Sequence, residues 1–258
     1  MLELNSTYED LRFDLQSIDS LLERATLIHE GRNTLWRVEV EGQSLCVKRY
    51  GFSSMLKRWI YRYLRPSKAQ KAWHNTICLR QAGIDSPEPV ALIETYSLRG
   101  IENSYYICRY EQGSTLYRWG DCALQDIQQQ VVQLAHFAAS LHRAGLMLTD
   151  FTPGNILLAD DHFILVDTNR MNVGKVSIKR GLKNMAGLWL QPEVAELLAR
   201  EYVTARGGSD IDKYARAFAQ YRRLFWLRFT QRHYLRDVIS HYDLDGTCYM
   251  YHFNTTIR

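Results

Sequence analysis

The feature that most restricts the fold of this chain is a pair of short apolar runs bordered by three polar side chains. Ile156–Leu158 and Phe163–Val166 are separated by a few mostly polar residues, a pattern that predicts a β-hairpin. Asp150 and Asn155 precede the first run in a loop, and Asp167 directly follows the second run. Such a hairpin would place the three side chains around one pocket and offer hard oxygen ligands suited to Mg²⁺.

The order and spacing of these residues resemble the catalytic machinery of kinases, in which an Asp is followed by an Asn five positions on and by a metal-binding Asp after a hairpin. By this resemblance, Asp150 would accept the proton of the attacking hydroxyl. Asn155 and Asp167 would hold Mg²⁺ against the phosphates of ATP. The alternative reading of these residues alone is a surface loop in which Asp and Asn side chains make turns.

A second part of the pattern lies upstream. Leu35–Val40 and Ser44–Tyr50 alternate in polarity on either side of Glu41-Gly42, which predicts two strands joined by a turn. Lys48 ends an apolar run 102 positions before Asp150 and resembles the kinase strand lysine that meets the α- and β-phosphates. Gly31 lies in the loop before these strands, where a kinase covers the phosphates, although a single glycine is a poor signal of such a loop.

Other segments carry conventional signals of helices and strands. Pro66 and Gly83 bound one helix, and Gly207-Gly208 separates two more. The predicted elements are a helix from near Ser67 to about Gln81, strands at Val90–Thr95 and Tyr105–Tyr110, a helix over 123–143, and helices at Gln191–Ala205 and Asp210–Arg236.

Composition excludes several other classes of protein. The chain has 258 residues, is 46% hydrophobic and 23% charged, and has a net charge of +4, which is ordinary for a globular protein. Its start lacks the features of a secretory signal, and no apolar window approaches the ~20 residues needed to span a bilayer. The five cysteines are scattered without a C-x-x-C pair, so reduced thiols in a cytosolic protein are expected. Neither a metal-ligand spacing of His and Cys nor a G-x-S-x-G motif occurs.

A closer resemblance is to the lipopolysaccharide kinase family, which phosphorylates Kdo or heptose of the inner core. It rests on four segments that cover most of residues 44–171: VKRYGFSSMLKRWIYRYLRPSKAQKAWHN, GIDSPEPVALIE, TDFTPGNILL and LVDTNRM. The last eighty-odd residues match the family only loosely.

The resemblance implies an α+β, bilobal protein-kinase-like fold, with a small β-rich N-lobe over residues 1–112 and a mainly helical C-lobe over 113–258. Glu111 would begin the hinge whose backbone meets the adenine. ATP and Mg²⁺ would be the cofactors, and a lipid-linked sugar would be the acceptor. The expected location is the cytoplasm, with peripheral contact at the inner face of the inner membrane.

This chain departs from the kinase pattern at three places. Leu148 stands where kinases carry a His that braces the catalytic loop, and Thr168-Asn169 replaces the Phe-Gly after the metal-binding Asp. No Asp or Glu occurs between Gly51 and Ile84. The helix that should supply a Glu to Lys48 has His74-Asn75 instead.

The missing acid leaves two possibilities open. Either Glu88 or Glu94 pairs with Lys48, or the ion pair is absent. The second possibility favours a different class of function, a pseudokinase that keeps the fold as a binding or regulatory module. A kinase acting on another small molecule or on a protein hydroxyl is a further alternative.

Two basic regions bear on the partner. Lys57–Lys71 interleaves bases with Trp59, Tyr61 and Tyr63, and it could dock a glycolipid on an anionic membrane, bind nucleic acid, or be a solvated face with aromatic residues in the core. We expect no nucleic-acid partner. A second basic face is predicted on the last long helix, from Arg222, Arg223, Arg228, Arg232 and Arg236.

Overall fold

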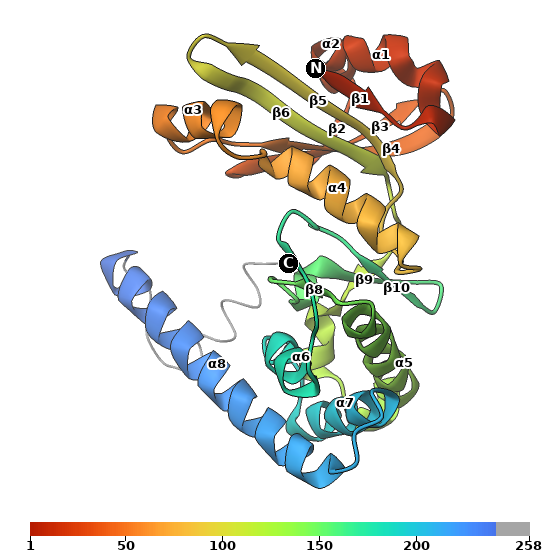
Figure 1. Ribbon diagram of the computed structural model, residues 1–258, viewed down its shortest axis with the longest axis vertical. Coiled ribbons are helices and arrows are strands. Elements are labelled where there is room, and N and C mark those ends of the chain that lie inside the picture. The colour runs from red at the N-terminus through yellow and green to blue at the C-terminus, as the bar shows by residue number, and fades with distance from the viewer. Residues whose placement is uncertain (241–258) are drawn as a thin grey trace. The chain divides into compact units, whose positions relative to one another are not determined.

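The computed structural model describes residues 1–240, with side chains described as far as residue 231. The side chains of Arg232 and Arg236, and the whole of Cys248, lie outside that part. The chain forms two compact units, one of Met1–Ser114 with Leu158–Asn172 and the other of Thr115–Leu157 with Val173–Arg258. A β-sheet dominates the first unit and helices dominate the second (Figure 1), which confirms the predicted α+β class with a β-rich N-terminal part and a mainly helical C-terminal part. The segment Leu158–Asn172, assigned from the sequence to the C-terminal lobe, groups with the first unit.

The first unit is built on a six-stranded antiparallel sheet with the order β1-β5-β6-β4-β3-β2. The hairpins β3–β4 and β5–β6 pair side by side through β4 and β6. The strands are β1 Leu2–Leu4, β2 Thr26–His29, β3 Asn33–Val40, β4 Gln43–Tyr50, β5 Pro89–Ser97 and β6 Gly100–Arg109.

The turn between β3 and β4 has the form that the sequence predicts. Glu41 and Gly42 both have positive φ angles, 47° and 73°, which suit a two-residue hairpin of the type that follows the twist of the strands. Alternation along β4 then sends Leu45 and Val47 into the core on one face of the sheet, and Lys48 to the other.

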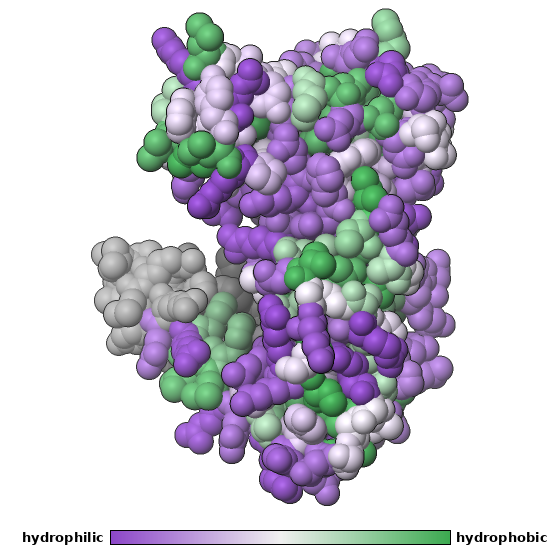
Figure 2. All heavy atoms as spheres, viewed as in Figure 1, coloured by the Kyte–Doolittle hydropathy of each residue, from purple (hydrophilic) through white to green (hydrophobic). Residues whose placement is uncertain are grey.

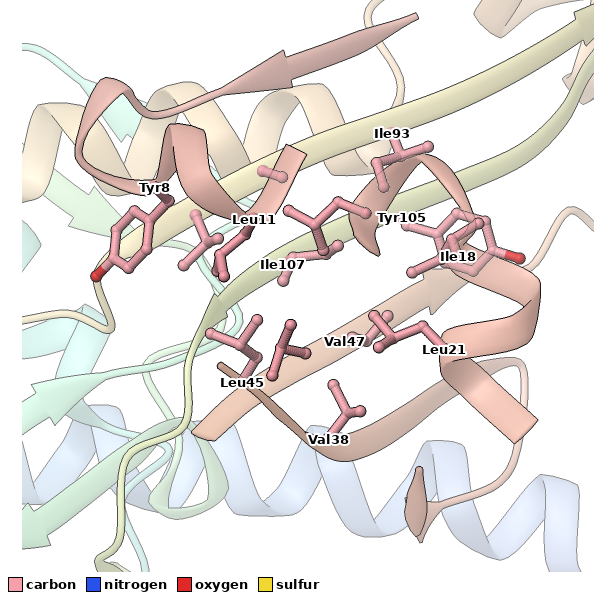
Figure 3. Close-up of a cluster of buried hydrophobic side chains, with 14 residues drawn as sticks. Tyr8, Leu11, Ile18, Leu21, Val38, Leu45, Val47, Ile93, Tyr105 and Ile107 are labelled. Carbon is pink, nitrogen blue, oxygen red and sulfur yellow. The ribbon is translucent and has the colours of Figure 1, made fainter. Parts of the chain in front are cut away.

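Helices cover both faces of this sheet. Tyr8, Leu11, Ile18 and Leu21 come from the N-terminal helices and pack on strand residues that include Val47 (Figure 3). The helices on this side are η1 Ser6–Leu11, α1 Arg12–Gln16 and α2 Ile18–Glu23.

The opposite face is covered by α4, Lys68–Gln81. Its start is fixed by a capping box, in which Ser67 Oγ accepts from the Gln70 amide and the Gln70 side chain accepts from the Ser67 amide. Trp73 of this helix packs on Tyr106 of β6 and its neighbours in a second apolar cluster. A further helix, α3 Met55–Tyr63, packs beside β6.

The second unit is helical, and its centre is the packing of α5 against α7 and of α7 against α8. Asp210 caps α8, because its Oδ1 accepts from the amide of Lys213. The elements are η2 Leu116–Asp121, α5 Leu124–Arg143, β8 Leu146–Leu148, η3 Pro153–Asn155, α6 Ile178–Met185, α7 Pro192–Ala205 and α8 Ile211–Ser240.

Short strands mark the places where the chain passes from one unit to the other: β7 Ser114–Thr115, β9 Ile156–Ala159 and β11 Met171–Val173. β9 and β10 His162–Leu165 form the predicted hairpin, whose turn residues Asp160 and Asp161 have φ angles of 42° and 66°. Across the residues that the structure describes, no helix has both the length and the apolar character needed to span a membrane.

Candidate functional site

Two of the predicted site residues meet in the first unit. Lys48 Nζ lies 2.5 Å from Asp167 Oδ1, although the two residues are 119 positions apart in the chain. The lysine side chain is only 12% exposed and the carboxylate 34%, so the pair is sheltered from water but open on the side of Asp167. Two opposite charges in this setting attract more strongly than on an open surface.

The backbone at Asp167 is strained, with a φ of 54°. Asp tolerates this left-handed conformation better than most residues, and such strain is common where a side chain must be aimed at a site. Asn169 Nδ2 donates to Asp167 Oδ1 at 2.6 Å and helps to hold the carboxylate in place. Burial raises the pKa of the nearby Tyr50 hydroxyl well above its ordinary value, and the negative charge of Asp167 raises it further.

Helix α4 forms hydrogen bonds with Thr168, the residue after Asp167. Asn75 Nδ2 donates to the Thr168 carbonyl at 2.7 Å. The hydroxyls of Tyr106, Thr76 and Thr168 form a buried chain that ends on the Ala72 carbonyl, with donor–acceptor distances of 3.0, 2.7 and 3.2 Å. Thr168 therefore acts as the attachment between α4 and the loop of Asp167, in the position where kinases have Phe.

Neither Glu88 nor Glu94, the two acids that the sequence suggested as partners of Lys48, forms an ion pair with it. Glu88 accepts from the Tyr8 hydroxyl at 2.8 Å. Glu94 is fully buried and accepts from Gln70 and Ser104, each at 2.8 Å. Both carboxylates are used to hold the N-terminal segment and α4 to the sheet, whereas Lys48 has Asp167 as its ion-pair partner.

The other two residues predicted to bind nucleotide also belong to the first unit. Gly31 is exposed in the loop between β2 and β3, and Glu111 is half-buried in the segment after β6. Cys46 and Cys108 lie opposite each other on β4 and β6, on the same side of the sheet as Lys48. Both are free thiols, as are Cys78 and Cys122.

Asp150 and Asn155 lie together in the second unit, in the loop that follows β8. Asn155 Nδ2 donates to the Asp150 carbonyl at 2.9 Å, which closes the loop on itself. Gly154 is required here for space, because a Cβ at this position would lie 2.5 Å from the Tyr117 hydroxyl. Both predicted side chains remain half-buried rather than enclosed.

A series of hydrogen bonds from Arg206 to the Leu148 carbonyl supports the backbone that leads into this loop. Arg206 Nη1 donates to the Tyr202 hydroxyl at 2.8 Å, and that hydroxyl donates to His142 Nδ1 at 3.0 Å. His142 Nε2 donates to Asn184 Oδ1 at 3.1 Å, and Asn184 Nδ2 donates to the Leu148 carbonyl at 2.7 Å. The tautomer of His142 follows from these partners, since the amide of Asn184 must donate to a carbonyl.

Leu148 stands where kinases carry a His that braces this loop, and here the loop is held through the backbone of Leu148 instead. A side chain at position 148 is not needed, because Asn184 holds the backbone of that residue two positions before Asp150. His142 is 1% exposed, and its pKa is lowered to about 4 by burial, which outweighs the hydrogen bond to Asn184. The imidazole is therefore neutral at pH 7, as the hydrogen-bond chain requires.

The donors available fit a magnesium nucleotide. Mg²⁺ usually takes one or two protein carboxylates or amide oxygens and completes its shell with phosphates and water. Asp167 in the first unit and Asn155 in the second each carry an oxygen of this kind, and the ammonium group of Lys48 is of the kind that binds phosphate oxygens. The described residues contain no cluster of three or more His, Cys, Asp or Glu side chains that could hold a metal without a substrate.

Sequence reasoning missed the residues that position the site. Thr168 and Asn75 could have been suspected from their place beside predicted site residues. His142 and Asn184 carry no local signal, because their roles depend on contacts across 42 residues of chain.

The β-sheet of the first unit and the helices of the second are those of a protein-kinase-like fold. No family model matches the sequence, and no curated protein sequence is similar to it. Among solved structures, WaaP in complex with acyl carrier protein has a TM-score of 0.58 at 18% identity, over 86% of this chain and 97% of that one. Aminoglycoside-3'-phosphotransferase of type VIII has a TM-score of 0.54 at 14% identity, over 83% of this chain and 99% of that one. At these identities the likeness establishes the shared fold.

Proposed function

We propose that this protein is an ATP-dependent kinase that phosphorylates a sugar hydroxyl, of Kdo or heptose, in the lipopolysaccharide inner core. The observation that carries the proposal is the ion pair between Lys48 Nζ and Asp167 Oδ1 at 2.5 Å, which supports a role for Lys48 at the phosphates and for Asp167 at the metal. The shared fold with WaaP and with an aminoglycoside phosphotransferase favours a small-molecule hydroxyl as acceptor.

The first step that these residues perform is nucleotide binding. Lys48 would hold the α- and β-phosphates, and Asp167 with Asn155 would hold Mg²⁺. When bound, Mg²⁺ neutralises the charge of the phosphates. Thr168 and Asn169 keep the carboxylate of Asp167 in place for this task. Gly31 would lie over the phosphates, and the backbone at Glu111 would meet the adenine.

The second step is proton transfer from the acceptor. Asp150 would orient the attacking sugar hydroxyl and accept its proton, so that the oxygen attacks the γ-phosphorus in line with the leaving oxygen. The series of hydrogen bonds that runs from Arg206 to the Leu148 carbonyl holds the backbone that carries Asp150. Most of the rate would come from positioning and charge neutralisation.

The acceptor proposed here is linked to a lipid, so the enzyme would work from the cytoplasm at the inner face of the inner membrane. A peripheral contact with an anionic membrane surface would bring the site to its substrate. A pseudokinase is the second candidate, and one observation favours it: α4 contains no Asp or Glu, so it offers Lys48 no helix acid.

The experiment that tests the proposal follows labelled γ-phosphate from Mg-ATP into an extract of lipopolysaccharide precursors. Label in a Kdo- or heptose-bearing glycolipid is expected with the wild-type protein and not with Asp150→Ala. The matched control is Asp126→Ala, which removes an exposed carboxylate from α5 and should transfer label normally. Label in protein alone would place the acceptor on a side chain. Absence of transfer despite measured ATP binding would favour the pseudokinase.

A further inference from the structure

Helix α3 has its apolar and polar sides reversed relative to an ordinary surface helix. Met55, Leu56, Trp59 and Tyr63 are spaced to share one side of the helix, and all four are exposed, with Leu56 67% exposed. None of the residues of α3 is buried. A surface helix normally turns its apolar stripe toward the core, so this arrangement needs an explanation.

The side of α3 that faces the sheet is instead polar and aromatic. Arg58 Nε donates to the Ile101 carbonyl of β6 at 2.8 Å, and the Arg62 guanidinium lies 4.2 Å from the ring centroid of Tyr96 on β5. Gly100 brings the hairpin against the helix backbone, because a Cβ there would lie 2.6 Å from the Arg58 carbonyl carbon. The apolar stripe is therefore held outward by specific contacts.

The same part of the first unit carries more apolar and basic side chains. Leu98, in the turn of the β5–β6 hairpin that rests on α3, is 96% exposed. Figure 2 shows hydrophobic residues on the surface of this part of the molecule, among hydrophilic ones. Residues 51–84 contain no Asp or Glu and seven bases, which are Lys57, Arg58, Arg62, Arg65, Lys68, Lys71 and Arg80.

We propose that α3 and the β5–β6 turn form a docking surface for an anionic phospholipid bilayer, with Met55, Leu56, Trp59 and Tyr63 entering the interfacial region. An outward apolar stripe on a helix within a segment that is rich in bases and free of acids is the composition of helices that lie in the membrane interface. Nucleic acid is the weaker fit, since exposed Leu and Met side chains gain nothing from phosphates or stacked bases. The proposal rests on the proposed function only in that a lipid-linked acceptor gives the contact its purpose.

The test is flotation of the purified protein with vesicles of phosphatidylcholine containing phosphatidylglycerol, without ATP or any sugar acceptor. Wild type should bind these vesicles, and should bind several-fold less to pure phosphatidylcholine because the basic residues then lack a partner. The double variant Leu56→Gln/Trp59→Gln should bind the vesicles at least about tenfold more weakly than wild type. The variant should fold normally, since neither side chain is buried. The matched control, Phe13→Gln/Leu27→Gln, removes two exposed apolar side chains elsewhere in the first unit and should bind like wild type.

Equal binding by wild type and Leu56→Gln/Trp59→Gln would overturn the proposal, as would the absence of vesicle binding. Binding to a single-stranded RNA oligonucleotide in preference to the vesicles would replace the bilayer with nucleic acid as partner. The vesicle assay contains no nucleotide. Vesicle binding can therefore be observed without phosphoryl transfer, and phosphoryl transfer without vesicle binding. The two proposals are therefore tested separately.

Discussion

The buried His142, whose hydrogen bonds support the loop of Asp150, makes stability depend on pH in a way that can be calculated. Burial lowers the pKa of His142 from 6.5 to about 4. The unfolded chain therefore binds a proton at a pH where the folded protein does not, and stability falls as the pH decreases. Above pH 6.5 this contribution to stability is fully present, and it is lost progressively as the pH falls toward 4.

The size of the effect follows from the two pKa values. With 6.5 for the unfolded state and about 4 for the folded state, His142 should remove about 2 kcal/mol of stability between pH 7 and pH 5. Other groups also titrate in this range, so the quantity to measure is a difference. The free energy of unfolding in urea is determined for wild type and for His142→Gln at each pH.

The difference in unfolding free energy between wild type and His142→Gln should shift by about 2 kcal/mol from pH 7 to pH 5, with wild type losing more. The absolute stability of the variant does not matter, because only the change with pH is compared. His162→Gln, which replaces an exposed histidine, is the matched control and should follow wild type. Parallel curves for wild type and His142→Gln would refute the assignment of His142 as a buried neutral group.

Three substitutions test the supports of the site. Asn184→Leu leaves the Leu148 carbonyl and the His142 ring N–H without partners, so it should lower the free energy of unfolding in urea by about 2–5 kcal/mol. It should also lower kcat. An unchanged unfolding midpoint would contradict the bracing role of Asn184. Asp167→Ala should weaken Mg-ATP binding measured by calorimetry far more than binding of metal-free ATP, and equal affinities would contradict its role as a ligand. Gly154→Ala should cost about 1–3 kcal/mol through the clash with Tyr117. Addition of Tyr117→Phe should recover part of that loss, and no recovery would locate the strain elsewhere.

Local signals allowed the sequence to predict much of the fold. Glu41-Gly42 marks the β3–β4 turn because few residues adopt two successive positive φ angles. Ser67 and Gln70 mark the start of α4 because they form a capping box within four residues. These elements depend on neighbours in the chain, so a sequence reading can find them.

Contacts between distant residues could not be predicted in the same way. The partner of Lys48 depends on a hydrogen-bonded network that orients Asp167 from a helix about ninety residues away, where Asn75 contacts Thr168. Trp59 could have been a core residue by composition, and its exposure follows only from how α3 packs on the β5–β6 hairpin. Tertiary packing decides such cases.

The most direct test of the central claim separates nucleotide binding from phosphoryl transfer at Asp150. Wild type and Asp150→Ala are compared for Mg-ATP affinity and for kcat with a Kdo- or heptose-bearing acceptor. The affinity should stay within a few-fold, because Asp150 is proposed to act on the acceptor, while kcat should fall by about 10²–10⁴-fold with the loss of the proposed general base. Wild-type turnover in Asp150→Ala would contradict the account, and so would a parallel loss of ATP affinity and turnover.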